Sequence, residues 1–304
     1  MLLPNDSVRY TFNVDNDLSN ENWVPPLPPE KILPQVLSPD NPPWNALVAL
    51  AVWVISILLI IFVPLIFLAP YMLSKGLNFY DSKAVNEFIF TDPTAIILQL
   101  APIILAHILT VLVGWAAVTR FKRYSFFKMI GWQMDGFRVW HAVAITICFY
   151  ALSILMTLIF GHVNNDFERL INNSRAAVYL VAIFATFTAP LVEELVYRGL
   201  LYSAFQRRFG MAVGVILVTL LFTLVHVPQY SLNGHPDMAA IVTLLLLSLT
   251  LTLIRAGTGN LLPCIVLHTI FNGVQSVLLI LQPFLESPET TPDPTGLIHL
   301  LHHF

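Results

Sequence analysis

The sequence predicts an all-α, polytopic membrane protein, a helix bundle with about seven transmembrane segments. Of its 304 residues, 57% are hydrophobic and only 11% are charged, whereas a soluble globular protein has about 25% charged residues. The apolar residues also gather in runs of roughly 20 residues, the length that crosses a bilayer as a helix. The formal net charge is only −3, and nothing in the charge pattern indicates a nucleic-acid surface.

Seven apolar runs are expected to form membrane segments. They cover residues 44–73, 93–119, 139–160, 176–208, 211–227, 238–254 and 261–281. The first segment is long enough to cross with a tilt or with a kink at Pro64, because proline lacks a backbone N–H and collides with the preceding turn. The fourth segment begins near Ala176 and is expected to continue as a helix to Arg208.

The chain divides into four expected regions. Residues 1–43 contain PPLPPEKILPQ and SPDNPPW, which predicts a disordered, proline-rich arm. Residues 44–175 form accessory transmembrane segments and loops, and residues 176–281 form a membrane core whose motifs are described below. Residues 282–304 form a flexible tail ending in IHLLHHF, in which we expect a loose histidine cluster rather than a metal site.

Basic residues predict the orientation in the membrane. The connection after the second segment and the connection after the fourth are rich in lysine and arginine: Arg120, Lys122, Arg123, Lys128, Arg138, Arg207 and Arg208. Short loops with this excess stay in the cytoplasm, so we expect a cytoplasmic amino terminus and an external carboxy terminus. The chain is then a multi-pass integral membrane protein, in the plasma membrane if it is bacterial.

The fourth segment contains three ionisable side chains in an otherwise apolar run, Glu193, Glu194 and Arg198. Charges at membrane depth are costly, so they are normally paired or functional. Glu194 and Arg198 are four residues apart, which predicts an ion pair on one helical face. Glu193 lies about 100° further round the helix, so this carboxylate is expected to remain available.

Two further polar pairs lie in later segments, Phe222-x-x-x-His226 and His268-x-x-x-Asn272. Glu193 lies 17 residues before Gly210 and His226 lies 16 residues after it. In two antiparallel helices both would then lie about 25 Å from the turn, so they can meet. His268 is expected to lie less deep, about 13 Å along its helix from the preceding glycine turn.

The ordered motifs EExxxR, FxxxH and HxxxN resemble the CPBP family of intramembrane glutamic endopeptidases. This family includes the type II CAAX prenyl endopeptidases and bacterial relatives linked to bacteriocin self-immunity. The resemblance covers residues 176–281, which it marks as the expected catalytic core.

The resemblance implies a role for each motif residue. Glu193 would be the general base that activates a water, and His226 would hold this water and manage the proton delivered to the leaving amine. His268 and Asn272 would polarise the scissile carbonyl and stabilise the oxyanion. Structural support would come from Glu194, Arg198 and Phe222.

The expected partners are a peptide or protein substrate, prenylated or membrane-anchored, and the lipid bilayer, without nucleic acid. We expect no cofactor. A zinc site made by two histidines and a glutamate is the chemical alternative, although the HExxH spacing that places two ligands on one helix is absent. Cleavage is expected near the cytoplasmic side of the bilayer.

Two other functions remain open. An ion-coupled transporter or proton relay would also place glutamate and histidine inside the membrane, although no inverted repeat is visible in the sequence. A non-catalytic membrane protein of the bacteriocin-immunity type would keep the fold and act by binding a partner.

Overall fold

The computed structural model describes residues 36–161, 163, 165–232 and 234–285. In this part of the chain the only strands are two residues long each, β1 (Ser231–Leu232) and β2 (His235–Pro236), and they form one antiparallel hairpin. The predicted all-α fold is therefore confirmed. The histidine-containing end of the tail and residues 1–35 of the arm lie outside the described residues.

The described helices follow one another with short connections. In chain order they are α2 (Ala46–Ser74), α3 (Ser82–Thr91), α4 (Pro93–Leu100), α5 (Ile103–Thr119), α6 (Phe126–Ile130), α7 (Val139–Phe160), α8 (Asp166–Asn172), α9 (Arg175–Ile183), α10 (Ala189–Glu194), α11 (Ser203–Phe209), α12 (Met211–His226), α13 (Met238–Thr258) and α14 (Leu262–Leu285). Two π-helical segments, η1 (Phe184–Thr188) and η2 (Leu195–Tyr202), flank α10.

Six helical stretches in the described part of the chain are long and apolar enough to cross a membrane: Ala46–Ser74, Pro93–Thr119, Val139–Phe160, Arg175–Phe209, Met238–Thr258 and Leu262–Gln282. The remaining predicted segment, 211–227, is the shorter helix α12 of 16 residues. At 1.5 Å per residue α12 extends about 24 Å, less than the roughly 30 Å of a hydrocarbon core. The predicted seven segments are thus six long ones and a short one.

The second predicted segment is divided at a proline. Pro102 precedes the first residue of α5, and α4 ends at Leu100. Since proline cannot donate a backbone hydrogen bond and restricts the residue before it, a break at this point is expected. In α2, by contrast, Pro64 and Pro70 lie within one continuous helix.

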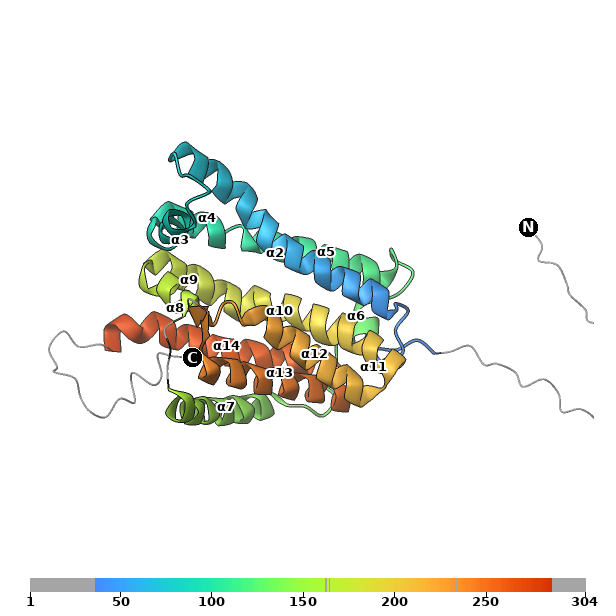
Figure 1. Ribbon diagram of the computed structural model, residues 1–304. Helices are drawn as coiled ribbons and strands as arrows, with labels where there is room; N and C mark the ends of the chain where they lie inside the picture. Colours follow the sequence, from blue (N-terminus) through green and yellow to red (C-terminus); the bar gives the residue numbers. More distant parts are fainter. Residues whose placement is uncertain (1–35, 162, 164, 233, 286–304) are drawn as a thin grey trace, which may run out of the picture. The chain divides into compact units, whose positions relative to one another are not determined.

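The helices form layers around the central segment η2 (Figure 1). Helix α2 packs against α5 on one side of the bundle, and α7 packs against α13 and α14 on the other. All eight residues of η2 are buried. The indole of Trp44 is also buried and donates to the carbonyl of Leu200 at 3.1 Å, which ties the start of the first helix to the centre.

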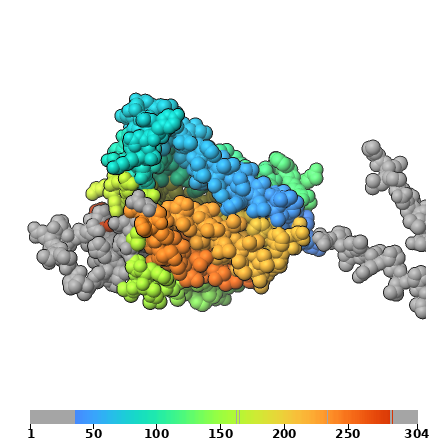
Figure 2. Space-filling view, in the orientation of Figure 1, coloured from blue at the N-terminus to red at the C-terminus, as the bar shows by residue number. Residues whose placement is uncertain are grey.

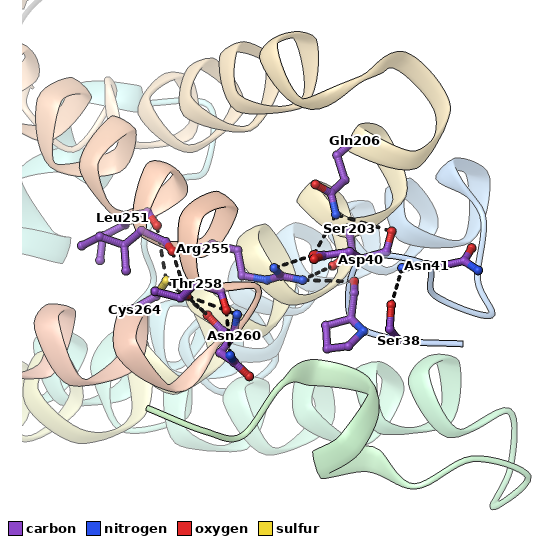
Figure 3. Close-up of polar contacts among 12 residues, drawn as sticks. Ser38, Asp40, Asn41, Ser203, Gln206, Leu251, Arg255, Thr258, Asn260 and Cys264 are labelled. Atoms are coloured by element: carbon purple, nitrogen blue, oxygen red, sulfur yellow. Dashed lines mark hydrogen bonds and ion pairs between the residues drawn. The ribbon is translucent and has the colours of Figure 1, made fainter. Parts of the chain in front are cut away.

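A segment before α2, residues 37–43, lies against the ends of several helices, and we name it the N-terminal strap. The buried guanidinium of Arg255 donates from Nη1 to Asp40 Oδ1 at 2.8 Å (Figure 3). Its Nη2 donates to the carbonyl of Pro39 and to Ser203 Oγ, both at 3.0 Å. The strap therefore supplies the counter-ion and a neutral acceptor for a buried cation.

Other side chains bind the same strap. Gln206 donates to the strap's aspartate at 2.9 Å (Figure 3), and the carbonyls of Pro43 and Pro42 accept from Arg120 and Arg207. The ends of α5, α11 and α13 consequently lie at one end of the bundle, as the predicted orientation requires.

The strap differs from the expected solvated arm, which was to include all of residues 1–43. Its carbonyl oxygens and its aspartate are the acceptors for arginines that reach it from three helices. Composition alone does not reveal these acceptors, because a proline-rich segment has the same appearance whether its carbonyls face water or protein.

The connection between α13 and α14 packs closely against Gly131. Gly131 and Leu261 are both buried, and Leu261 N donates to the Gly131 carbonyl at 2.8 Å. Gly131 has a φ of +73°, and an added Cβ would lie 2.8 Å from Asn260 Oδ1 and 2.9 Å from its Cα. Only glycine fits this position.

We predict that Gly131→Ala destabilises the protein more than Gly136→Ala. Both glycines have a positive φ, +73° and +83°, but a Cβ at Gly136 would meet open space. Gly136→Ala should cost roughly 1–2 kcal/mol for the left-handed backbone, and Gly131→Ala a further ~1–3 kcal/mol for overpacking. Equilibrium unfolding in mixed micelles measures both, and equal losses would contradict the proposed close approach.

Candidate active site

The three motifs occupy neighbouring helices in the centre of the bundle. Glu193 and Glu194 lie at the end of α10, and Arg198 lies in η2. The second motif, from Phe222 to His226, occupies the last turn of α12, and the third motif lies in α14. The three motifs therefore lie on three different stretches of helix, α10 with η2, α12 and α14, and the first of these packs against the other two.

Irregular helix geometry surrounds the two glutamates. Pro190 is the second residue of α10, and α10 follows the π-helical η1 directly. A proline ring collides with the carbonyl four residues earlier in a regular helix, and the wider turn of η1 accommodates this collision. Single π turns within α-helices occur frequently at functional sites.

Glu194 and Arg198 form the predicted ion pair. Arg198 Nη1 donates to Glu194 Oε1 at 2.9 Å, and both side chains are fully buried. The other guanidinium nitrogens are bound as well: Nη2 donates to Ser248 Oγ at 2.9 Å and to the Ser248 carbonyl at 3.0 Å, and Nε donates to Thr252 Oγ1 at 3.3 Å. A buried cation is stable only when its donors are satisfied in this way, so Arg198 has a structural role.

His268 contacts both glutamates. Its Nδ1 lies 2.8 Å from Glu194 Oε1, and its Nε2 lies 3.8 Å from Glu193 Oε2. A carboxylate paired with a guanidinium only accepts hydrogen bonds, so Nδ1 carries the hydrogen and Nε2 faces Glu193. The rise per residue predicts a shallower position for His268. The observed contacts agree with a deeper-set turn, since Leu261, directly before α14, is buried and donates to the Gly131 carbonyl.

The two adjacent glutamates have different surroundings. The Glu194 side chain is fully buried, whereas the Glu193 side chain is 25% exposed and lines a cavity. The nearest ion-pair contact of Glu193 is His268 Nε2, at a distance too long for a direct hydrogen bond. Glu193 therefore has room for a water or a substrate atom, as the sequence predicts.

His226 presents one ring nitrogen to the same cavity. Its Nδ1 donates to the carbonyl of Phe222 at 2.7 Å, because a carbonyl has no hydrogen to give. In the neutral ring Nε2 is then an acceptor. The Phe222 ring supports this arrangement: its centroid lies 4.6 Å from that of His226 and 4.6 Å from the guanidinium carbon of Arg198.

Asn272 also lines the cavity, but one of its donors is already used. Asn272 Nδ2 donates to the carbonyl of Ala185 in η1 at 3.0 Å. The amide nitrogen has two hydrogens, so one remains for a ligand. The hydrogen bond to η1 fixes the position of this second hydrogen.

The cavity has a volume of about 620 Å³ and contains all four predicted catalytic residues in its lining. Figure 2 shows the surface hollowed between the N-terminal helices, in blue and teal, and the orange C-terminal half. Most of the wall is apolar and includes Ile57, Ile60 and Ile61 of α2. A volume of this size accommodates a small organic molecule or a few residues of a peptide.

The cavity extends from the motif residues toward the end of the bundle opposite the N-terminal strap, and the side of cleavage stays a prediction. Phe167 of α8, together with Gln229 and Tyr230 after α12, belongs to its lining. These residues lie in connections at the end opposite the N-terminal strap, because α7 and α12 both start at the strap end. If the arginine-rich loops are cytoplasmic, the cavity extends toward the other face of the membrane.

The lining includes further polar residues that were not predicted as site residues from the sequence, and three of them have polar aromatic rings. His107 of α5 has its Nδ1 2.8 Å from Thr188 Oγ1, and Tyr197 and Tyr230 have hydroxyl groups. For His107 a signal was present, since a single ionisable residue in the apolar run IILAHILT is itself an indication of function. The tyrosines have no such signal, because their placement depends on the tertiary structure.

Tyr230 remains a neutral hydroxyl. It lies outside the membrane-spanning helices, in the connection after α12. Burial raises the pKa of Tyr230 to about 12, and the negative charges of Glu193 and Asp237 act in the same direction. Since the pKa lies far above neutrality, the phenol is protonated throughout the physiological range.

Among the residues that the structure describes, no three histidine, cysteine, aspartate or glutamate side chains converge as a set of metal ligands. Each imidazole of the two motifs has its Nδ1 bound to a protein acceptor, His226 to a carbonyl and His268 to Glu194.

One comparison with known proteins identifies a family. The family model described as type II CAAX prenyl endopeptidase, Rce1-like, matches residues 175–274. This range contains all three motifs. No curated protein and no solved structure matches the chain significantly.

We predict that Arg198→Met alone destabilises the protein more than the double variant Glu194→Gln/Arg198→Met. The single change leaves the Glu194 carboxylate buried with His268 as its remaining partner, and breaking a buried pair typically costs about 3–5 kcal/mol. The double change removes both charges. Equilibrium unfolding in micelles provides the comparison, and additive losses would show that the two side chains do not interact.

Proposed function

Since residues 175–274 match the family model of the type II CAAX prenyl endopeptidases, we propose that the chain is an intramembrane endopeptidase that uses a water activated by Glu193. The observation that carries this proposal is the difference between the two glutamates. Glu194 is fully buried in an ion pair, while Glu193 faces the cavity with His268 Nε2 at 3.8 Å.

The reaction needs one base, one relay and donors for the carbonyl oxygen. Glu193 takes a proton from the water as the water oxygen bonds to the scissile carbonyl carbon, and the carbonyl electron pair moves onto its oxygen. When the C–N bond breaks, the proton passes from Glu193 to the leaving nitrogen, with His226 as relay. The products are a carboxylic acid and an amine, so the sum is addition of one water to the peptide bond.

Several contacts support these roles. The neutral His226 ring offers Nε2 as an acceptor for the second hydrogen of the water, because its Nδ1 is bound to the Phe222 carbonyl. Asn272 has one free amide hydrogen for the carbonyl oxygen. His268 donates to Glu194 from Nδ1, so it offers a hydrogen at Nε2 only as an imidazolium.

The apolar wall of the cavity fits a substrate that arrives from the bilayer. Ile57, Ile60 and Ile61 of α2 belong to this wall, and the Ile61 side chain is 54% exposed. We propose a membrane-anchored peptide as substrate. Both a prenylated CAAX peptide and an unmodified membrane peptide are compatible with such a wall, and the assay below includes both.

We predict that Glu193→Gln abolishes peptide cleavage and leaves the thermal stability unchanged. The amide retains the size of the side chain but cannot accept the proton. The assay uses the protein in phospholipid vesicles with two internally quenched peptides, one with a farnesyl-cysteine before its last three residues and one without the farnesyl group. Comparative proteomics of cells with wild-type or variant protein then identifies the natural uncut substrate.

Two matched variants separate activity from folding. Glu87→Gln changes an exposed carboxylate of α3 outside the cavity and should leave cleavage unchanged. Glu194→Gln should lower stability, because it removes the counter-ion of Arg198. Undiminished cleavage by Glu193→Gln would rule out the proposed mechanism, and Glu193-dependent ion flux without cleavage would favour a transporter.

We also propose that hydrolysis proceeds without a metal ion. Phenanthroline and EDTA should leave the cleavage rate unchanged, and elemental analysis of the purified protein should find less than one zinc per chain. Loss of cleavage with chelators, restored by added zinc, would instead assign Glu193, His226 and His268 as ligands.

A further inference from the structure

The proposed reaction places negative charge on the carbonyl oxygen, and the donors assigned to this oxygen are limited. Asn272 uses one of its two amide hydrogens in the hydrogen bond to the Ala185 carbonyl. His268 uses its Nδ1 hydrogen in the hydrogen bond to Glu194. A neutral His268 therefore leaves a single amide hydrogen, whereas such sites generally supply two or more preorganised donors.

The hydroxyl of Tyr197 has a hydrogen without an assigned acceptor. Trp53 of α2 donates from Nε1 to Tyr197 Oη at 3.0 Å. An indole nitrogen only donates, so the tyrosine oxygen accepts this bond and retains its own hydrogen. Within the described part of the chain, no acceptor for that hydrogen is found.

Tyr197 also has the right position. It lies one helical turn after Glu193, and both side chains line the cavity. The Tyr197 side chain is only 5% exposed, and its ring packs edge-on against Phe222 with the centroids 4.9 Å apart. Two independent contacts, one to the ring and one to the oxygen, thus hold the hydroxyl in place.

We propose that the Tyr197 hydroxyl donates a hydrogen bond to the scissile carbonyl oxygen and that Trp53 positions it. This inference rests on the proposed peptidase function. Tyr197 is thereby a further catalytic residue, and Trp53 is a positioning residue that acts through it.

The hydrogen bond from the Tyr197 hydroxyl to the carbonyl oxygen strengthens as negative charge develops on that oxygen, and the phenol keeps its proton. As the water oxygen bonds to the carbonyl carbon, the π electron pair moves to the oxygen, and the phenol hydrogen and the Asn272 amide hydrogen both point at it. When the C=O bond re-forms, the C–N bond breaks and the nitrogen takes the proton that Glu193 holds. Tyr197 ends the cycle in the protonation state in which it began.

Two other ring groups of the cavity, Tyr230 and His107, fit this role less well. Tyr230 lies in the connection after α12, and no hydrogen bond orients its hydroxyl among the residues that the structure describes. His107 is bound through Nδ1 to Thr188 Oγ1, and this hydroxyl is 3.4 Å from the Phe184 carbonyl. If Thr188 donates to that carbonyl, His107 uses its ring hydrogen on Thr188 and presents an acceptor to the cavity.

We predict that Tyr197→Phe lowers kcat by roughly 100- to 1,000-fold, the effect of removing one oxyanion donor, and leaves KM within about threefold because the ring remains. The probes are the two quenched peptides described above, in vesicles. The matched control is Tyr202→Phe, which removes another buried hydroxyl from η2 that lies outside the cavity lining and should leave kcat unchanged.

Two readouts separate the proposed role from a structural one. The pH profile of kcat/KM should keep its acid limb in Tyr197→Phe, whereas a hydroxyl that merely orients Glu193 would move that limb to higher pH when removed. Trp53→Phe should lower kcat less than Tyr197→Phe, and the double variant should equal Tyr197→Phe, because Trp53 acts only through the hydroxyl.

The possible outcomes test the role of Tyr197 separately from the proposed peptidase function. Cleavage by wild-type protein and by Tyr197→Phe at equal rates overturns the role of Tyr197 alone, as does a loss of kcat in Tyr230→Phe with Tyr197→Phe unaffected. Cleavage of neither peptide by wild-type protein, or equal cleavage by Glu193→Gln, overturns the proposed function and this inference together.

Discussion

The site depends on the buried ion pair between Glu194 and Arg198. Its guanidinium binds two residues of α13, Ser248 and Thr252, and its carboxylate binds His268 of α14. One pair therefore links the helix that contains both glutamates to two other helices. Since neither side chain is exposed, removal of either partner leaves a charge in a region of low dielectric, which is the most expensive defect such a core can have.

This pair also explains how two adjacent carboxylates coexist at membrane depth. Arg198 neutralises Glu194 directly, so the local repulsion between the glutamates is reduced. Glu193 can then keep a partly wet environment without a permanent counter-ion, which is what a group that exchanges protons requires. The two adjacent glutamates therefore have different roles. Glu194 lies next to Arg198 and forms the ion pair, while Glu193 faces the cavity and can exchange protons.

Local sequence patterns predicted the parts of the structure that depend on local geometry. The Glu194–Arg198 contact follows from a spacing of four residues, and the long helices follow from the length of the apolar runs. The contact of His268 with both glutamates could not be predicted from helix rise, because the depth of the turn before α14 depends on its packing against Gly131. The same holds for Trp53 and Tyr197, which are 144 residues apart in the chain.

The N-terminal strap has a consequence for the order in which the protein assembles. Asp40 precedes its partner Arg255 by 215 residues, so it leaves the ribosome long before the arginine does. Asp40 is half exposed and can remain hydrated during this delay at little free-energy cost. Arg255 becomes fully buried, and a buried guanidinium without a counter-ion would be costly in free energy. Its counter-ion, Asp40, has already been synthesised when Arg255 is added to the chain. Biosynthesis thus delivers the tolerant partner first, and the contact between Asp40 and Arg255 can form only after α13 has been synthesised.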